Sequence, residues 1–172
     1  MTEATPASDS QTLSIERIQA VFQAQKSAFD KAPYPSALQR RQQLKAIKKQ
    51  ISRYQDVLAH AMHQDFGCRS HAESKMLDLL GSTLEANHAI SHVKHWMKPS
   101  RRGTELLFLT NKLEVRYQPK GVVGVIVPWN FPVYLALGPL IAAIAAGNRV
   151  MVKMPEITPH TNEEKKKMLT DI

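Results

Sequence analysis

The sequence contains a single cysteine, Cys68, in 172 residues, so no disulfide can form within the chain. A lone thiol is typical of a reducing compartment, and we predict a cytoplasmic location. Long apolar runs are missing too. The longest apolar stretch, at residues 133–146, is shorter than the roughly 20 residues that a membrane span requires. The polar N-terminus, MTEATPASDSQT, has neither the basic nor the apolar region of a secretory signal.

Aromatic residues make up only 6% of a chain whose net charge is +8. A basic chain raises the possibility of nucleic-acid binding. Here the basic residues are scattered over predicted helix faces, without the interleaved aromatic residues on which bases stack. We therefore predict no nucleic-acid partner. One basic run is interpreted as a solvated helix face rather than an anion site: Arg40, Arg41, Lys45, Lys48 and Lys49.

Recognisable glycine and metal-ligand motifs are also absent. Gly121 and Gly124 lie before and within a predicted strand, so they do not form a G-x-G-x-x-G dinucleotide fingerprint. His88 and His92 share a helix face at a spacing that could hold a metal. No cysteine or carboxylate pattern completes such a site and HExxH is missing, so we predict structural histidines and no metal. The histidines considered are His71, His88, His92 and His95.

The clearest structural pattern in the sequence lies at residues 121–153. Residues 121–127 form a continuous apolar run rich in β-branched side chains, which predicts a parallel strand covered on both faces. Pro128 ends the strand because proline has no N–H for a ladder. Residues 133–146 are apolar almost all round, as in a helix packed between a sheet and another layer. Gly147 tolerates a left-handed cap, and residues 149–153 return as a second strand. The pattern is a βαβ unit.

Helical periodicity dominates the region before this unit. We predict a disordered tail at residues 1–12 and N-terminal helices within residues 13–105. Two capping-box patterns begin the second and third helices: Ser36 with Gln39, and Ser70 with Glu73. The predicted apolar stripe of the second helix comprises Leu38, Leu44, Ile47, Ile51, Leu58 and Met62. That of the third comprises Met76, Leu77, Leu80, Leu84, Ile90, Val93 and Trp96.

Residues 106–118, LLFLTNKLEVRYQ, predict a β-hairpin with its turn at residues 110–112. Its exposed edge could pair with another subunit or stay on its own domain. Periodicity does not distinguish these alternatives, because it carries no information about where an edge docks.

Residues 161–172 form a divergent, polar C-terminal segment, NEEKKKMLTDI after Thr161. We expect a short, frayed helix or a disordered end here. Only three side chains of the segment are expected to pack: Met168, Leu169 and Ile172.

Several spaced motifs in the central stretch carry a resemblance. PKGVVGVIVPWNFP, then LGPLIAAIAAGNRVMVK, then Glu156 three residues after Lys153, resemble the NAD(P)-dependent aldehyde dehydrogenase superfamily. The details are most similar to its coniferyl-aldehyde dehydrogenase branch, near the class 3 enzymes. The resemblance covers residues 14–161 and implies the N-terminal portion of such an enzyme. The implied fold is α/β: N-terminal helices pack on the first βαβ part (residues 119–160) of a Rossmann-like sheet. The sheet is expected to be truncated, and residues 106–118 are expected to form a hairpin of the oligomerisation type.

The resemblance also implies roles for individual residues. Asn130 matches the asparagine of the PWN motif, whose amide donates to the oxyanion; an alternative is an ordinary helix N-cap. Lys153 and Glu156 match a pair that binds the hydroxyls of the adenosine ribose, and the carboxylate would repel a 2′-phosphate, which favours NAD over NADP. Their alternative is an ordinary charged strand end. Three more residues would line the cofactor cleft, although the last could equally be a core residue: Val127, Pro128 and Trp129.

The family's catalytic cysteine, general-base glutamate and glycine motif are expected beyond Ile172. Cys68 lies in a predicted loop far upstream of the nucleophile motif and is interpreted as a bystander, although Arg69 beside it could lower its pKa. By family we therefore expect an oxidoreductase that oxidises aldehydes with NAD and that forms a homo-oligomer when it is complete. We expect this chain alone to be inactive. The alternative is a truncated, non-catalytic interaction module that docks on a full-length relative through residues 106–118.

Overall fold

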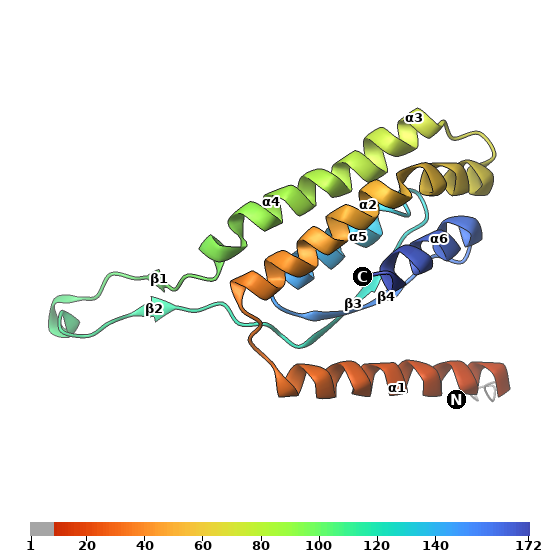
Figure 1. The fold of residues 1–172 in the computed structure, drawn as a ribbon. Coiled ribbons are helices and arrows are strands. Elements are labelled where there is room, and N and C mark those ends of the chain that lie inside the picture. The colour runs from red at the N-terminus through yellow and green to blue at the C-terminus, as the bar shows by residue number, and fades with distance from the viewer. Residues whose placement is uncertain (1–8) are drawn as a thin grey trace, which may run out of the picture.

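A two-stranded parallel sheet lies at the centre of the fold in the computed structural model, which describes residues 9–172 (Figure 1). Strand β3 (Val122–Ile126) pairs with strand β4 (Arg149–Lys153) in parallel, and helix α5 (Tyr134–Ala145) connects them. The register runs from Val122 opposite Arg149 to Ile126 opposite Lys153. The βαβ unit predicted from the sequence is confirmed.

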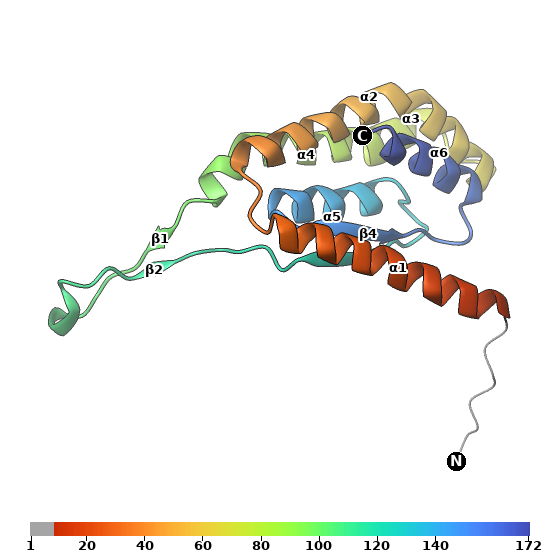
Figure 2. The ribbon, with the colours of Figure 1, turned by 60° about the horizontal axis from the view of Figure 1, so that its bottom comes forward.

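The helices form layers on both sides of this sheet (Figure 2). Helix α1 (Asp9–Lys31) runs along one face and α5 covers the other. Beyond α5 lie α2 (Ala37–Phe66), α4 (Gly81–Trp96) and α6 (Pro159–Thr170). Helix α5 is thus enclosed between the sheet and a helical layer, which explains its apolar surface. The main core cluster includes Leu44, Ile47, Ile51, Leu58, Met62, Val93, Leu137, Ile141 and Met168.

Both predicted N-cap serines accept the expected backbone hydrogen bond, and the first of the two predicted capping boxes is reciprocal. Ser36 and Gln39 form a reciprocal capping box at the start of α2, and Gly67 ends that helix with a φ of 70°. Ser70 accepts a hydrogen bond from the backbone of Glu73 at the start of α3 (His71–Ser74). A π-helical segment, η1 (Lys75–Leu80), joins α3 to α4 without a break. None of the helices within residues 9–172 is long and apolar enough to cross a membrane.

The buried face of the third predicted helix differs from the expected apolar stripe. Five members of that stripe are exposed instead: Met76, Leu77, Leu80, Leu84 and Trp96. The residues that face the core are mostly small or polar: Ser74, Asp78, Leu79, Ser82, Ala86, Ala89 and Val93. The stripe prediction was wrong because small side chains allow a close approach between helices without a large apolar signal. An added Cβ at Gly81 would lie 3.0 Å from the ring of Tyr134 in α5.

Other sequence expectations also need correction. Leu38 is 65% exposed, whereas Arg40, assigned to a solvated face, is buried and donates to the carbonyl oxygens of Pro35 and Ala145. The helices do not cover strand β3 over its whole length, because Ile126 at its end is 81% exposed. Helix α1 begins at Asp9, so the last part of the expected disordered tail is helical, while residues 1–8 lie outside the described residues.

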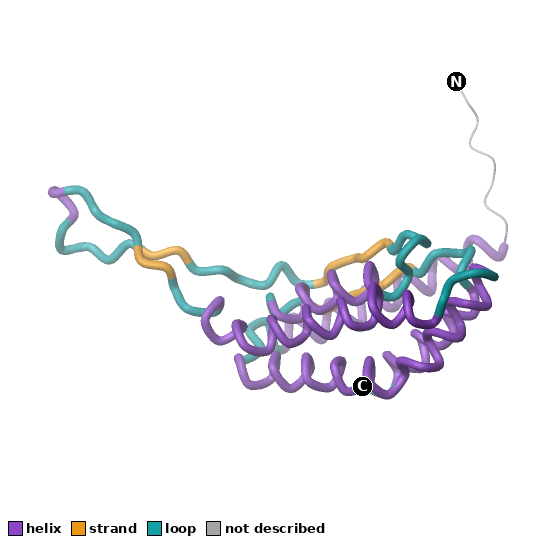
Figure 3. Tube along the Cα trace, turned by 90° about the horizontal axis from the view of Figure 1, so that it is seen from above, coloured by secondary structure: helices purple, strands orange, loops and turns teal. Residues whose placement is uncertain are grey.

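The hairpin exists and its second strand lies within the predicted range, but its first strand lies before that range. Strand β1 (Ser100–Arg101) pairs in antiparallel fashion with β2 (Glu114–Val115), and a 3-10 turn, η2 (Leu106–Phe108), forms the tip. The run at residues 106–109 is therefore not a strand. The hairpin projects away from the helices (Figures 1 and 3). Its apolar tip is open, with Leu106 84% and Leu107 87% exposed.

Helix α6 replaces the expected frayed C-terminal segment. It packs on α2, and its first turn is capped by the Asp65 carboxylate, which accepts from the backbone N–H groups of His160 at 3.1 Å and Thr161 at 2.8 Å. After its last turn, Asp171 accepts from Tyr54 at 2.8 Å. Met168 is fully buried as predicted, but Ile172 is 51% exposed.

Replacing Gly147 with alanine should lower the free energy of unfolding by about 1–3 kcal/mol. Gly147 has a φ of 90°, and an added Cβ would lie 2.5 Å from Nη2 of Arg40. That guanidinium is held by two carbonyl oxygens and cannot easily move. Urea denaturation measures the effect. Gly103→Ala is the control, because nothing lies within 4 Å of its added Cβ; equal losses in both variants would contradict the expectation.

Candidate functional site

The residues singled out in the sequence meet at one edge of the parallel sheet. The backbone N–H of Val127, just after β3, donates to the carbonyl oxygen of Lys153 at the end of β4, at 3.0 Å. The segment of residues 128–133 therefore begins directly beside the segment of residues 154–156. In open α/β sheets, ligands bind at the carboxyl ends of the strands, so this edge is the candidate site.

The PWN residues lie open at this edge. Val127 is buried, whereas Pro128, Trp129 and Asn130 are exposed. Trp129 is 53% exposed, with its ring centroid 6.3 Å from that of Phe66, so it is not a core residue.

The alternative role of Asn130 as an N-cap is wrong. The N-terminus of α5 has no capping side chain at its own N-cap position, Val133. Instead Oδ1 of Asp78 accepts from the backbone N–H groups of Val133 at 3.1 Å and Tyr134 at 2.8 Å. The exposed amide of Asn130 is not used to start the helix.

Lys153 and Glu156 form an exposed ion pair on the neighbouring segment. Their side chains are 54% and 78% exposed. The hydrogen bond from Lys153 lowers the pKa of the Glu156 carboxyl below its usual value, so the group is an anion at neutral pH. An exposed carboxylate of this kind can accept hydrogen bonds from hydroxyl groups.

A buried polar cluster, which the sequence interpretation missed, lies behind this edge. It comprises Arg69, Asp78 and Lys165, whose side chains come from the loop after α2, from η1 and from α6. Burial raises the pKa of Asp78, opposed by its hydrogen bonds and by Arg69. Burial lowers the pKa of Lys165 to about 8. No apolar periodicity marks these three residues, which is why pattern analysis did not find them.

The remaining candidates do not form a site. Cys68 is exposed in the loop between α2 and α3, and the guanidinium of Arg69 is directed to Asp78 and Asn130 instead. His88 stacks on His92 with ring centroids 4.1 Å apart. Within residues 9–172, no group of three or more histidine, cysteine, aspartate or glutamate side chains is placed to hold a metal ion.

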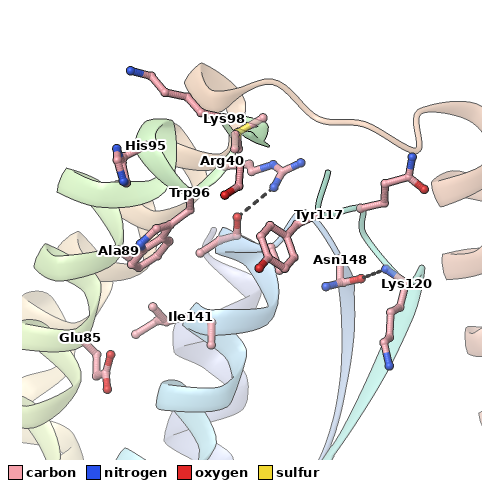
Figure 4. Close-up of a pocket in the computed structure, with 16 residues that line it drawn as sticks. Arg40, Glu85, Ala89, His95, Trp96, Lys98, Tyr117, Lys120, Ile141 and Asn148 are labelled. Atoms are coloured by element: carbon pink, nitrogen blue, oxygen red, sulfur yellow. Dashed lines mark hydrogen bonds between the residues drawn. The ribbon is translucent and has the colours of Figure 1, made fainter. Parts of the chain in front are cut away.

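A cavity of about 650 Å³ lies at the opposite end of the sheet (Figure 4). Trp96 and Tyr117 face it from either side, and Ile141 of α5 lines its floor. Lys120 and Asn148 mark the amino ends of the two strands, and the Lys120 N–H donates to Asn148. Because ligands of α/β sheets bind at the carboxyl ends, this cavity is not the dinucleotide candidate.

Comparison with known proteins agrees with this geometry. Residues 3–171 match the profile of the aldehyde dehydrogenase family. The chain belongs to this family. It is 44% identical over 158 residues to a Pseudomonas aeruginosa protein named "Probable coniferyl aldehyde dehydrogenase", covering 92% of this chain and 33% of the relative. The chain thus spans about a third of the length of that relative.

Solved structures of the family share the fold. AldH of Staphylococcus aureus, in a substrate-bound state, superposes with a TM-score of 0.86 at 28% identity, covering 90% of this chain and 33% of that one. PnpE in complex with nicotinamide adenine dinucleotide gives a TM-score of 0.72 at 26% identity, over 86% of this chain and 29% of that one. The described residues therefore adopt the N-terminal part of the aldehyde dehydrogenase fold, as the sequence resemblance implied.

Proposed function

We propose that residues 1–172 supply the N-terminal part of the cofactor and oxyanion site of an NAD-dependent aldehyde dehydrogenase. This enzyme oxidises coniferyl aldehyde or another aromatic aldehyde to the acid. The observation that carries this proposal is the hydrogen bond from Val127 to Lys153, because it brings the Asn130 segment and the Lys153–Glu156 pair to one carboxyl edge within a family member. The aromatic substrate follows from the likeness to the Pseudomonas relative.

Each residue has a defined role in this proposal. The amide of Asn130 donates a hydrogen bond to the oxygen of the aldehyde as that oxygen gains negative charge. Glu156 accepts hydrogen bonds from the hydroxyls of the adenosine ribose, and Lys153 holds its carboxylate in place. The cofactor cleft is lined by Val127, Pro128 and Trp129. NAD, when bound, accepts the hydride. The exposed Lys153–Glu156 pair fits this group, since its carboxylate is ionised and reachable.

The 172 residues by themselves are predicted to have no dehydrogenase activity. Oxidation by this family's chemistry needs a thiolate nucleophile and a general base. Cys68 is the one cysteine of the sequence, and it lies in an exposed loop after α2, on an element apart from β3 and β4. Incubation with NAD and coniferyl aldehyde, followed by NADH absorbance, should show no turnover; measurable turnover would contradict this prediction. A cytoplasmic location remains part of the proposal and is checked by cell fractionation.

Glu156→Gln should weaken NAD binding to the chain by about 2- to 12-fold, the loss expected for one hydrogen bond of about 0.5–1.5 kcal/mol. NADP binding should change less, because the neutral amide no longer repels the 2′-phosphate. Saturation-transfer NMR with each dinucleotide measures both affinities. Glu105→Gln, at an exposed glutamate beside the hairpin tip, is the matched control. An unchanged ratio of the NAD to the NADP affinity would argue against the ribose role.

A second candidate is a non-catalytic interaction module, favoured by the open apolar tip of the hairpin at Leu106 and Leu107. In this candidate the hairpin docks on a full-length relative, and in a complete enzyme it contributes to a homo-oligomer. Size-exclusion chromatography with and without the relative distinguishes it: co-elution that Leu107→Asp abolishes would support docking, and independent elution would exclude it.

A further inference from the structure

The segment of residues 128–133 carries Asn130 but contains no helix or strand of its own. Two of its residues, Pro128 and Pro132, have no backbone N–H, so the segment has few backbone donors of its own. Side chains from three other elements instead bind its polar backbone atoms or those at its junction with α5: Arg69, Asp78 and Lys165.

Arg69 holds the middle of the segment. One arm of its guanidinium donates to the carbonyl oxygen of Asn130 at 2.9 Å, and the other donates to Oδ2 of Asp78 at 2.7 Å. The same guanidinium contacts the ring of Phe66 at 5.1 Å and the ring of Phe131 at 5.0 Å. Since a guanidinium is a planar, rigid fork, it fixes direction as well as distance.

Asp78 holds the end of the segment. Its Oδ2 accepts a hydrogen bond from the guanidinium of Arg69. Its Oδ1 accepts hydrogen bonds from the backbone N–H groups of Val133 and Tyr134 at the start of α5. The side chain is fully buried and lies on the π-helical turn η1. Such turns are rare and occur frequently at functional sites.

Lys165 holds the carbonyl oxygen of Pro132, at 2.8 Å. Its side chain is fully buried and reaches the segment from α6. Buried charged groups therefore bind backbone atoms at four positions: Asn130, Pro132, Val133 and Tyr134. A buried charge costs stability unless it is well paired. Arg69 in addition keeps a buried Nε–H without a partner among the described residues. An arrangement with this cost is poorly explained by stability alone.

We propose that Arg69, Asp78 and Lys165 are positioning residues that fix residues 128–133 and thereby direct the exposed amide of Asn130 toward the substrate oxygen. The inference rests on the proposed function for the role of Asn130. The structural part of the inference is separate: the backbone at Asn130 and directly after it is held by buried side chains, while the Asn130 side chain is exposed. An oxyanion donor must be preorganised in this way, because reorganisation during the reaction would cancel its benefit.

The test compares Lys165→Met and Arg69→Lys with Lys167→Met in the 172-residue chain. Lys165→Met keeps much of the side-chain volume but removes the donor to Pro132, and Arg69→Lys keeps the charge but removes the fork. Lys167 lies on the same helix in exposed pairs with Glu163 and Glu164, so its variant is the matched control. Two signals are recorded by NMR: hydrogen exchange at the N–H groups of Val133 and Tyr134, and the side-chain amide resonances of Asn130.

Both test variants should accelerate exchange at Val133 and Tyr134 by about tenfold relative to the amides of Leu44 and Ile47 in α2. They should also shift the Asn130 side-chain resonances, and the control should do neither. The proposal is overturned if both test variants leave these signals unchanged, or if all amides accelerate equally, which is the signature of a purely structural role. The measurement uses no cofactor or aldehyde, so its failure is separate from a failure of NAD binding or of catalysis.

Discussion

Met168→Ala is expected to lower the free energy of unfolding by about 2–5 kcal/mol, the range for truncating a buried methionine or leucine. Met168 is fully buried and shares the main core cluster with Leu58 and Met62 of α2. The cavity left by truncation would lie between two helices that are also joined by the Asp65 cap and the Asp171 hydrogen bonds. These contacts limit how far α6 can move to fill the space.

Ile172→Ala supplies the comparison for this variant. Ile172 follows α6 and is 51% exposed, so its truncation should change stability by no more than about 0.5 kcal/mol. Urea denaturation followed by circular dichroism measures both variants. If both cost equally little, α6 does not pack as the structure has it, and the sequence-based expectation of a frayed segment would be restored.

Asn130→Ala is expected to lower kcat by about 10²–10³, the usual loss for one oxyanion-hole donor. The experiment needs a catalytic nucleophile and a general base. It therefore uses a chimera in which residues 1–172 replace the matching part of the Pseudomonas relative and are followed by the rest of that protein. The KM for NAD should stay close to its original value, because the proposed role of Asn130 is at the reacting oxygen and not at the adenosine ribose. NADH formation with coniferyl aldehyde measures both constants.

Asn87→Ala is the control in the same chimera, since Asn87 is an exposed asparagine on α4. Its kcat should match that of the unsubstituted chimera. A loss of kcat below threefold in Asn130→Ala would reject the oxyanion role, and a rise in KM for NAD with kcat preserved would move Asn130 to the cofactor instead.

The parts of the fold that the sequence predicted correctly have a strong apolar signal. Strand β4 has the predicted bounds, and β3 and α5 lie within their predicted runs, because β-branched and apolar residues cluster there. Both serine caps and the left-handed Gly67 also follow from local rules.

The parts that were mispredicted have polar or small residues in buried positions. In α6 the inward residues are Thr161, Lys165 and Met168, so the helix resembled a solvated tail. Arg40 resembled a surface charge because its carbonyl partners, on Pro35 and Ala145, are known only from the tertiary structure.

The candidate site shows the same division. The motif residues were found because a resemblance identified them, and the structure brings their two segments together. The positioning cluster was not found because its members lie at residues 69, 78 and 165, far apart in the sequence, and each is an ordinary charged residue in its local context. Charge pairing across such distances leaves no periodic pattern.

The packing of α6 on α2 has a consequence during synthesis on the ribosome. The side of α2 that α6 covers emerges by residue 66, whereas Met168 and Asp171 are added only near residue 170. At about 5–20 residues per second, the delay is on the order of 5–20 s. For that time an apolar strip of a long helix stays open to water and to neighbouring nascent chains. We expect the chain to be open to aggregation and accessible to chaperones during this interval.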